Sequence, residues 1–287
     1  MLIENTSPQP ITMSAKEVAR ARKTAKQLQE TSAVGFKTKE ITIGPVFANL
    51  MGFVWGLLMF IPVFILYYNK FNYIIEPNVM EYMSAIAYLA YLIAIPIHEG
   101  IHGICMYLFN GHKRDAIEFG INSSMPYCTC QAPIKKWPYV VVLVMPTIVL
   151  GIVFSLLTLH LGSAIWLFFT FATFAGAGGD FTIVSKLIFR KEKELTVIDH
   201  PYKCGYLMLH KDEAEDETDR IVNELNNIQE KKTDPAEKKK TIKVVAIIFA
   251  IVIACAAIGG IVIGLLADYP QYNDDQIIVS TESDVNT

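Results

Sequence analysis

The chain of 287 residues lacks several features that would assign it to a common soluble or secreted class. Its formal net charge is only −3, so composition gives no reason to expect a nucleic-acid partner. Its five cysteines are an odd number without regular spacing, which argues against a disulfide scaffold and suits a reducing compartment. Residues 1–46 are polar, so we expect no cleavable signal peptide. The inverted repeat of a secondary transporter is also missing.

Long apolar runs are what the chain does have. Hydrophobic residues make up 52% of it, which is high for a soluble protein of this size. A helix needs roughly 20 apolar residues to cross a bilayer, and five runs are long enough. These runs are residues 47–68, 83–109, 138–161, 164–189 and 244–267. The sequence therefore predicts an all-α polytopic membrane protein with five transmembrane helices.

The segments between these runs are polar. In residues 1–46, Ser14 and Glu17 have capping-box spacing ahead of a basic helix, which either lies on an anionic leaflet or, as we favour, is solvated. EFGIN and PYCTCQAPI, between the second and third runs, predict a small cytoplasmic β-hairpin. Residues 211–243 predict a charged cytoplasmic linker helix, and residues 268–287 an acidic, disordered tail.

The distribution of positive charge predicts the orientation in the membrane. Lysine and arginine concentrate before the first run, between the second and third, and after the fourth. By the positive-inside rule, the N-terminus is expected in the cytoplasm and the C-terminus outside the cell. The expected location is thus the cell membrane, as a multi-pass protein.

The second apolar run contains HEGIHG, from His98 to Gly103. Ionisable residues at membrane depth are costly and mark functional sites. His98 and His102 are four residues apart, so a helix presents both imidazoles on one side, with Glu99 one position round. This arrangement is typical of two zinc ligands and a general base. Polar contacts between helices are the alternative, although such contacts do not require a carboxylate between two histidines.

The fourth run contains AGAGGDF, with Asp180 among small residues. His102 and Asp180 lie about seven and eight residues from the cytoplasmic ends of their runs, or roughly 10–12 Å deep at 1.5 Å per residue. Asp180 can therefore complete a His₂Asp set with an open fourth position, or else be a helix-packing or ion-pair residue. Weaker candidate ligands are His112, Glu118, Asp199, His200 and the Cys128–Cys130 pair, while His160 and His210 look incidental.

HEGIHG, PYCTCQAPIKKWPY, GAGGDF and VIDHPYKCGY together resemble the putative zincin peptidase family of bacterial membrane proteins, over roughly residues 45–210. More remotely, the layout is similar to site-2 proteases, although these have Leu-Asp-Gly where this chain has Gly179-Asp180-Phe181. The resemblance implies a membrane-embedded zincin-like domain over residues 47–210. In it, His98, His102 and Asp180 would hold Zn²⁺ and Glu99 would be the base.

Two functions from different classes follow from this reading. The first is an intramembrane zinc metalloprotease, whose partners are the lipid bilayer and a membrane protein or peptide substrate. The second is a non-catalytic membrane protein with a structural or sensory zinc site, closed by a fourth ligand such as His112 or Glu118. The sequence indicates neither the substrate nor the oligomeric state.

Overall fold

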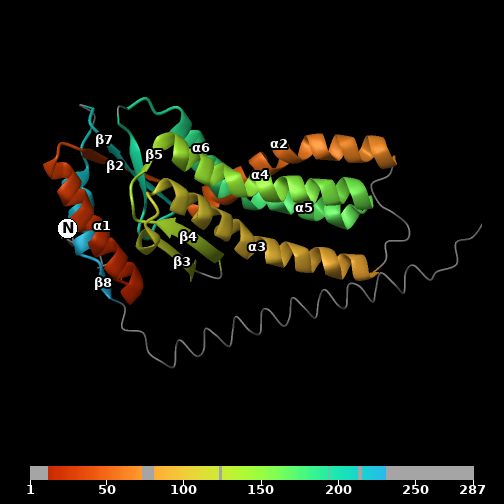
Figure 1. Cartoon of the computed structure of the whole chain (residues 1–287), viewed down its shortest axis with the longest axis horizontal. Coiled ribbons are helices and arrows are strands. Elements are labelled where there is room, and N and C mark those ends of the chain that lie inside the picture. Colours follow the sequence, from red (N-terminus) through yellow and green to blue (C-terminus); the bar gives the residue numbers. More distant parts are fainter. Residues whose placement is uncertain (1–11, 73–80, 123–124, 193, 213–214, 231–287) are drawn as a thin grey trace, which may run out of the picture.

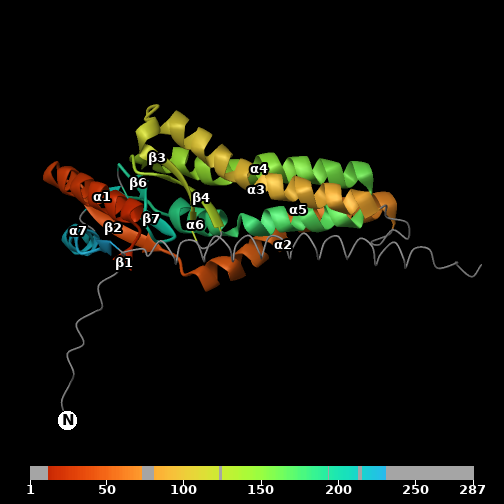
Figure 2. The same cartoon turned by 90° about the horizontal axis from the view of Figure 1, so that it is seen from below.

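The computed structural model describes residues 12–72, 81–122, 125–192, 194–212 and 215–230. The molecule is elongated, with long helices at one end and a small sheet flanked by two helices at the other (Figures 1 and 2). The predicted fifth span, the acidic tail and residues 231–243 of the predicted linker lie outside the described residues.

The elements follow one another as β1 (Thr12–Met13), α1 (Ala15–Ala33), β2 (Lys37–Thr42), α2 (Pro45–Phe71), α3 (Glu81–Phe109), the 3₁₀ turn η1 (Arg114–Ala116), β3 (Ile117–Asn122), β4 (Met125–Cys130), β5 (Ile134–Lys135), α4 (Lys136–Leu161), α5 (Ala164–Gly176), α6 (Gly178–Ile188), β6 (Thr196–Asp199), β7 (Gly205–His210), α7 (Thr218–Asn226) and β8 (Gln229–Glu230).

Three helices are long and apolar enough to cross a membrane: α2, α3 and α4. They carry large apolar side chains on their outer surfaces, such as Leu57, Ile104 and Leu156, which a lipid environment would accommodate. The helices α5 and α6 make a fourth span only if the two, bent by 41° relative to each other, are taken together. The described part of the chain therefore holds three or four candidate spans.

The unbroken helix expected over residues 164–189 is thus wrong in detail, because the chain breaks at Ala177 between α5 and α6. The break occurs in a run of glycine and alanine, and glycine is a poor helix former. Glycine at position 178 also allows α2 to approach closely. A Cβ atom on Gly178 would lie only 1.8 Å from the Cα of Gly52, so any other residue there would clash with α2. Small residues permit this backbone-to-backbone contact.

The expected all-α class is also corrected, because the chain contains a four-stranded antiparallel sheet in the order β2-β7-β6-β5. Tyr206 and Met208 of β7 point into one core, and Leu207 and Leu209 point into another. A strand that is buried on both faces has a continuous run of apolar residues. Its sequence therefore lacks the two-residue alternation of apolar and polar side chains that would predict a strand.

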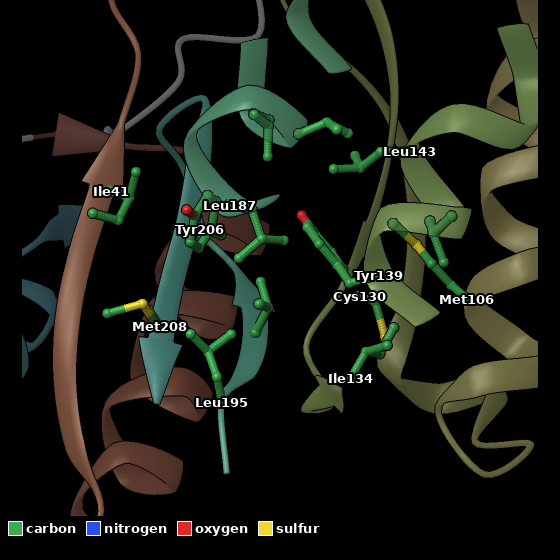
Figure 3. Packing of buried hydrophobic residues seen from close by; sticks show 14 of the residues in the cluster. Ile41, Met106, Cys130, Ile134, Tyr139, Leu143, Leu187, Leu195, Tyr206 and Met208 are labelled. Carbon is green, nitrogen blue, oxygen red and sulfur yellow. The ribbon is translucent and has the colours of Figure 1, made fainter. Parts of the chain in front are cut away.

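The sheet separates two hydrophobic cores. One lies between the sheet and the near ends of α3, α4 and α6, and includes Ile134, Tyr139 and Leu143 (Figure 3). The other lies beneath α1 and α7, which cover the opposite face of the sheet. The Ser14–Glu17 capping box starts α1 as predicted, but this helix is packed on one side rather than merely solvated, since Leu28 is fully buried.

Candidate metal centre

Three side chains converge where α3 meets α6. His98 Nε2 lies 3.1 Å from Asp180 Oδ2, and His102 Nε2 lies 3.4 Å from the same oxygen. The two Nε2 atoms are 3.2 Å apart. The expected depth match between α3 and α6 therefore brings these three side chains together, and they form a group of potential metal ligands.

These distances can be tested against the geometry of a metal ion. Zinc binds histidine nitrogen and carboxylate oxygen at about 2.0–2.1 Å in a tetrahedron, so its ligand atoms lie about 3.3 Å from one another. The three observed separations, 3.1 to 3.4 Å, agree with that value. The two imidazoles and the carboxylate therefore fit three corners of a zinc tetrahedron.

A proline in α4 orients His102. The imidazole Nδ1 lies 2.9 Å from the backbone oxygen of Val142. This carbonyl would normally accept a helical hydrogen bond from residue 146, but Pro146 has no N–H to donate. With Nδ1 donating to the free carbonyl, Nε2 keeps its lone pair for a metal. The functional role of Val142 was missed from the sequence, although a proline four residues later was the signal.

Glu99 is half-buried beside this group of ligands. Its carboxylate lies close enough to His98, His102 and Asp180 to interact with their charges, and it accepts a hydrogen bond from the backbone of Cys128 in β4. The carboxylate is therefore positioned between the potential metal ligands and the strand β4.

The antiparallel strands β3 and β4 form a two-stranded ribbon with two distinct faces. On the face toward α3, Phe119 packs on Gly103, and the thiol of Cys128 lies 3.8 Å from the sulfur of Met106. On the other face, Glu118 forms an ion pair with Arg20 of α1 at 3.7 Å. The ribbon thus lies between α1 and the helix that carries HEGIHG.

The weaker candidates do not join the centre. Glu118 pairs with Arg20 on the far face of the ribbon, and His112 packs on the ring of Tyr107. Neither Cys128 nor Cys130 belongs to the group of potential metal ligands among the described residues. Burial raises the pKa of both thiols, which disfavours the thiolate that a soft metal needs.

Asp199 and His200 have structural partners. The buried carboxylate of Asp199 accepts hydrogen bonds from the hydroxyl of Tyr139 and from the backbone N–H of Cys130, the latter at 2.6 Å. Burial raises the pKa of this carboxyl. His200 Nε2 faces Glu40 at 3.1 Å. These residues connect the sheet to β4, α4 and the N-terminal segment.

The His₂Asp group, with the carboxylate of Glu99 beside it, is a candidate metal site in a chain with three or four candidate membrane spans. The segment of residues 91–195 matches the protein-family model described as "putative zincin peptidase". It contains all four residues of the candidate centre. The family description points to a zinc metalloprotease. No curated protein and no solved structure matches the chain.

Proposed function

We propose that the protein is an intramembrane zinc metalloprotease, in which His98, His102 and Asp180 hold Zn²⁺ and Glu99 is the general base. The observation that carries the proposal is the convergence of three donor atoms at tetrahedral spacing next to an unligated carboxylate. A structural zinc site needs a fourth protein ligand and has no use for a base. The family match supports the same chemistry.

Zinc, when bound, would supply a Lewis acid that activates water and polarises a peptide carbonyl. Glu99 would take a proton from the attacking water on its carboxylate and pass it to the leaving amine. The backbone N–H of Cys128, hydrogen-bonded to that carboxylate, would orient it. Val142 would keep the imidazole of His102 in the tautomer that presents Nε2.

The substrate would be an extended stretch of a membrane protein or peptide. A helical backbone is closed to attack, so a transmembrane substrate would have to unwind locally. Among the described strands, β4 pairs with β3 along its ladder, and its backbone reaches Glu99 on the side of α3. An extended substrate that pairs with the β3–β4 ribbon would lie close to the general base.

Metal content of the detergent-purified protein tests the centre. We expect about one zinc per chain in the wild type and in Glu99→Gln, and loss of zinc in His98→Ala and Asp180→Ala. Zinc retained by Asp180→Ala would remove Asp180 from the ligand set. Metal absent from every sample after purification without chelators would overturn the zinc assignment.

Activity is tested by comparing membrane-protein fragments in cells that express wild type or Glu99→Gln. New protein N-termini should appear with the wild type and be missing with the variant, because the variant keeps the metal and loses the base. Identical fragments in both strains would contradict the role of Glu99.

Zinc removal distinguishes the enzyme from the structural alternative. A protease should lose activity on chelation and keep most of its helical content, since its packed cores do not depend on the ion. Cooperative unfolding on chelation, measured by circular dichroism, would favour a structural zinc site instead.

A further inference from the structure

A cavity of about 640 Å³ lies between α1 and the chain that follows α3, away from the ligands of the candidate metal centre. Four of its lining residues are basic: Lys23, Lys26, Lys113 and Arg114. Two are acidic, Glu30 and Asp115, so its walls carry an excess of positive charge.

The acidic residues leave most of this positive charge available. Lys26 pairs with Glu30 at 3.9 Å on the exposed surface of α1. Among the described residues, no carboxylate lies within ion-pair distance of Lys23, Lys113 or Arg114. The ammonium of Lys23 contacts the backbone oxygen of Asp115 at 3.4 Å, and the guanidinium of Arg114 lies over the ring of Tyr107, 5.4 Å from its centroid. The positive charges of these three side chains are therefore not neutralised by a carboxylate, and an anion in the cavity would be attracted to them.

The walls are held in place by buried or paired groups. Asn110 both donates to the backbone oxygen of Lys113 and accepts from its N–H, each at 2.9 Å, which sets the turn after α3. Opposite, the buried side chain of Gln131 is held by the hydroxyl of Thr24 at 2.6 Å. The cations thus project from a preorganised scaffold, which reduces the entropy lost on binding.

With α3 crossing a bilayer, the cavity would lie close to the lipid headgroups. The candidate span in α3 ends at Phe109, and His112, which lines the cavity, is three residues further along the chain. Three residues reach at most about 10 Å, and each headgroup layer is roughly 5–7 Å thick. The exposed ring of Trp137, at the start of α4, is a typical interfacial side chain close to Pro133 of the cavity.

We propose that this cavity binds the phosphate of an anionic phospholipid headgroup through Lys23, Lys113 and Arg114. The bilayer itself would supply the ligand at high local concentration, and the three cations would attract the negatively charged phosphate. This function is independent of the proposed proteolysis. It assigns α1, which lies outside the family-matched segment, a role in seating the protein in the membrane.

The test uses the full chain in dodecyl maltoside, titrated with dihexanoyl phosphatidylglycerol and followed by native mass spectrometry. We expect saturable binding that is stronger than that of dihexanoyl phosphatidylcholine. The triple variant Lys23→Ser/Lys113→Ser/Arg114→Ser should bind phosphatidylglycerol about tenfold more weakly or worse. The pair Lys23→Arg/Lys113→Arg should retain binding, because it preserves the charge.

A charge-matched variant provides the control. Lys16→Ser/Arg22→Ser/Lys191→Ser removes three exposed cations that do not line the cavity, and it should bind like the wild type. If both triple variants lost the same amount of phosphatidylglycerol affinity, the proposed binding site in the cavity would be wrong, and general electrostatic attraction to the positively charged surface would explain the binding. Equal binding of phosphatidylcholine, or inorganic phosphate binding as tightly as phosphatidylglycerol, would overturn the lipid assignment. Thermal unfolding of each variant checks that it is folded.

Discussion

Pro146 acts on the candidate metal centre through the backbone of Val142. Because it cannot donate a helical hydrogen bond, the carbonyl of Val142 is free to accept from His102. The sequence places a proline in this span, but it does not reveal which histidine on another helix the freed carbonyl meets. His98 and His102, by contrast, could be predicted, because their spacing depends only on the helical repeat.

Replacing Pro146 with alanine should weaken zinc binding. The new N–H would compete with His102 for the Val142 carbonyl, and loss of such a supporting contact typically costs about 10–100-fold in metal affinity. Competition with a chelator of known affinity measures the change. Pro62→Ala, which alters the interior of α2 away from the centre, is the matched control and should leave zinc affinity unchanged.

His200 should make stability depend on pH. Burial lowers the pKa of His200 to about 4. The negative charge of Glu40 raises this pKa and the positive charge of Lys203 lowers it, but burial has the largest effect, so His200 is neutral in the folded state near neutral pH. The contribution of neutral His200 to the free energy of unfolding is fully present above the ordinary pKa of 6.5, and it is lost as the pH falls toward 4. A shift of this size corresponds to about 3 kcal/mol.

The variant His200→Asn tests that prediction. In the wild type, His200 Nδ1 accepts hydrogen bonds from the backbone N–H groups of Tyr202 and Lys203, at 3.3 and 3.0 Å. The side-chain oxygen of asparagine can accept the same hydrogen bonds, but asparagine does not titrate. Thermal unfolding between pH 7 and pH 4 should therefore be less dependent on pH than in the wild type. An unchanged slope would assign the acid sensitivity to the neighbouring carboxylates Glu40 and Glu224.

At the scale of elements, the break between α5 and α6 brings Asp180 to the centre. It starts a new helix at Gly178, so that Asp180 lies in the first turn of α6. The sequence indicates the small residues and the approximate depth of Asp180, but not the bend. The bend depends on contact with α2, whose partner residue Gly52 lies far away along the chain.

Two neighbouring glycines should respond differently to alanine. A Cβ on Gly178 would lie 1.8 Å from the backbone of Gly52, whereas a Cβ on Gly179 would have nothing within 4 Å. Gly178→Ala must push α2 and α6 apart, at a cost of about 2 kcal/mol or more. It should lower both the unfolding temperature and the zinc content.

Gly179→Ala is the control, and it should leave stability and zinc content close to those of the wild type. Equal behaviour of the two variants would show that the close approach of α2 to α6 does not determine the position of Asp180.

At the scale of the whole molecule, the fold extends well beyond the family-matched segment. The sheet needs β2 from the N-terminal segment and β7 from beyond residue 195. The sequence did not predict this sheet, because β2 and β7 pair across more than 160 residues and local patterns carry no information about such pairing.

A fragment of residues 91–195 should therefore fail to hold zinc, since it lacks α2, β2 and β7. A fragment of residues 12–230 should bind about one zinc per chain, because it keeps the three potential ligands and both cores. Metal analysis of the two purified fragments checks this. Zinc bound by the shorter fragment would show that the sheet is dispensable for the centre.

The position of Glu99 beside the His₂Asp group has a consequence for charge balance. Two neutral imidazoles contribute nothing, while Asp180 and Glu99 contribute two negative charges when ionised. A divalent ion makes the sum zero, and in surroundings of low dielectric constant a neutral assembly is far cheaper than a charged one. A monovalent ion would leave an uncompensated negative charge and a trivalent ion a positive one, so the protein should select ionic valence before it selects the element.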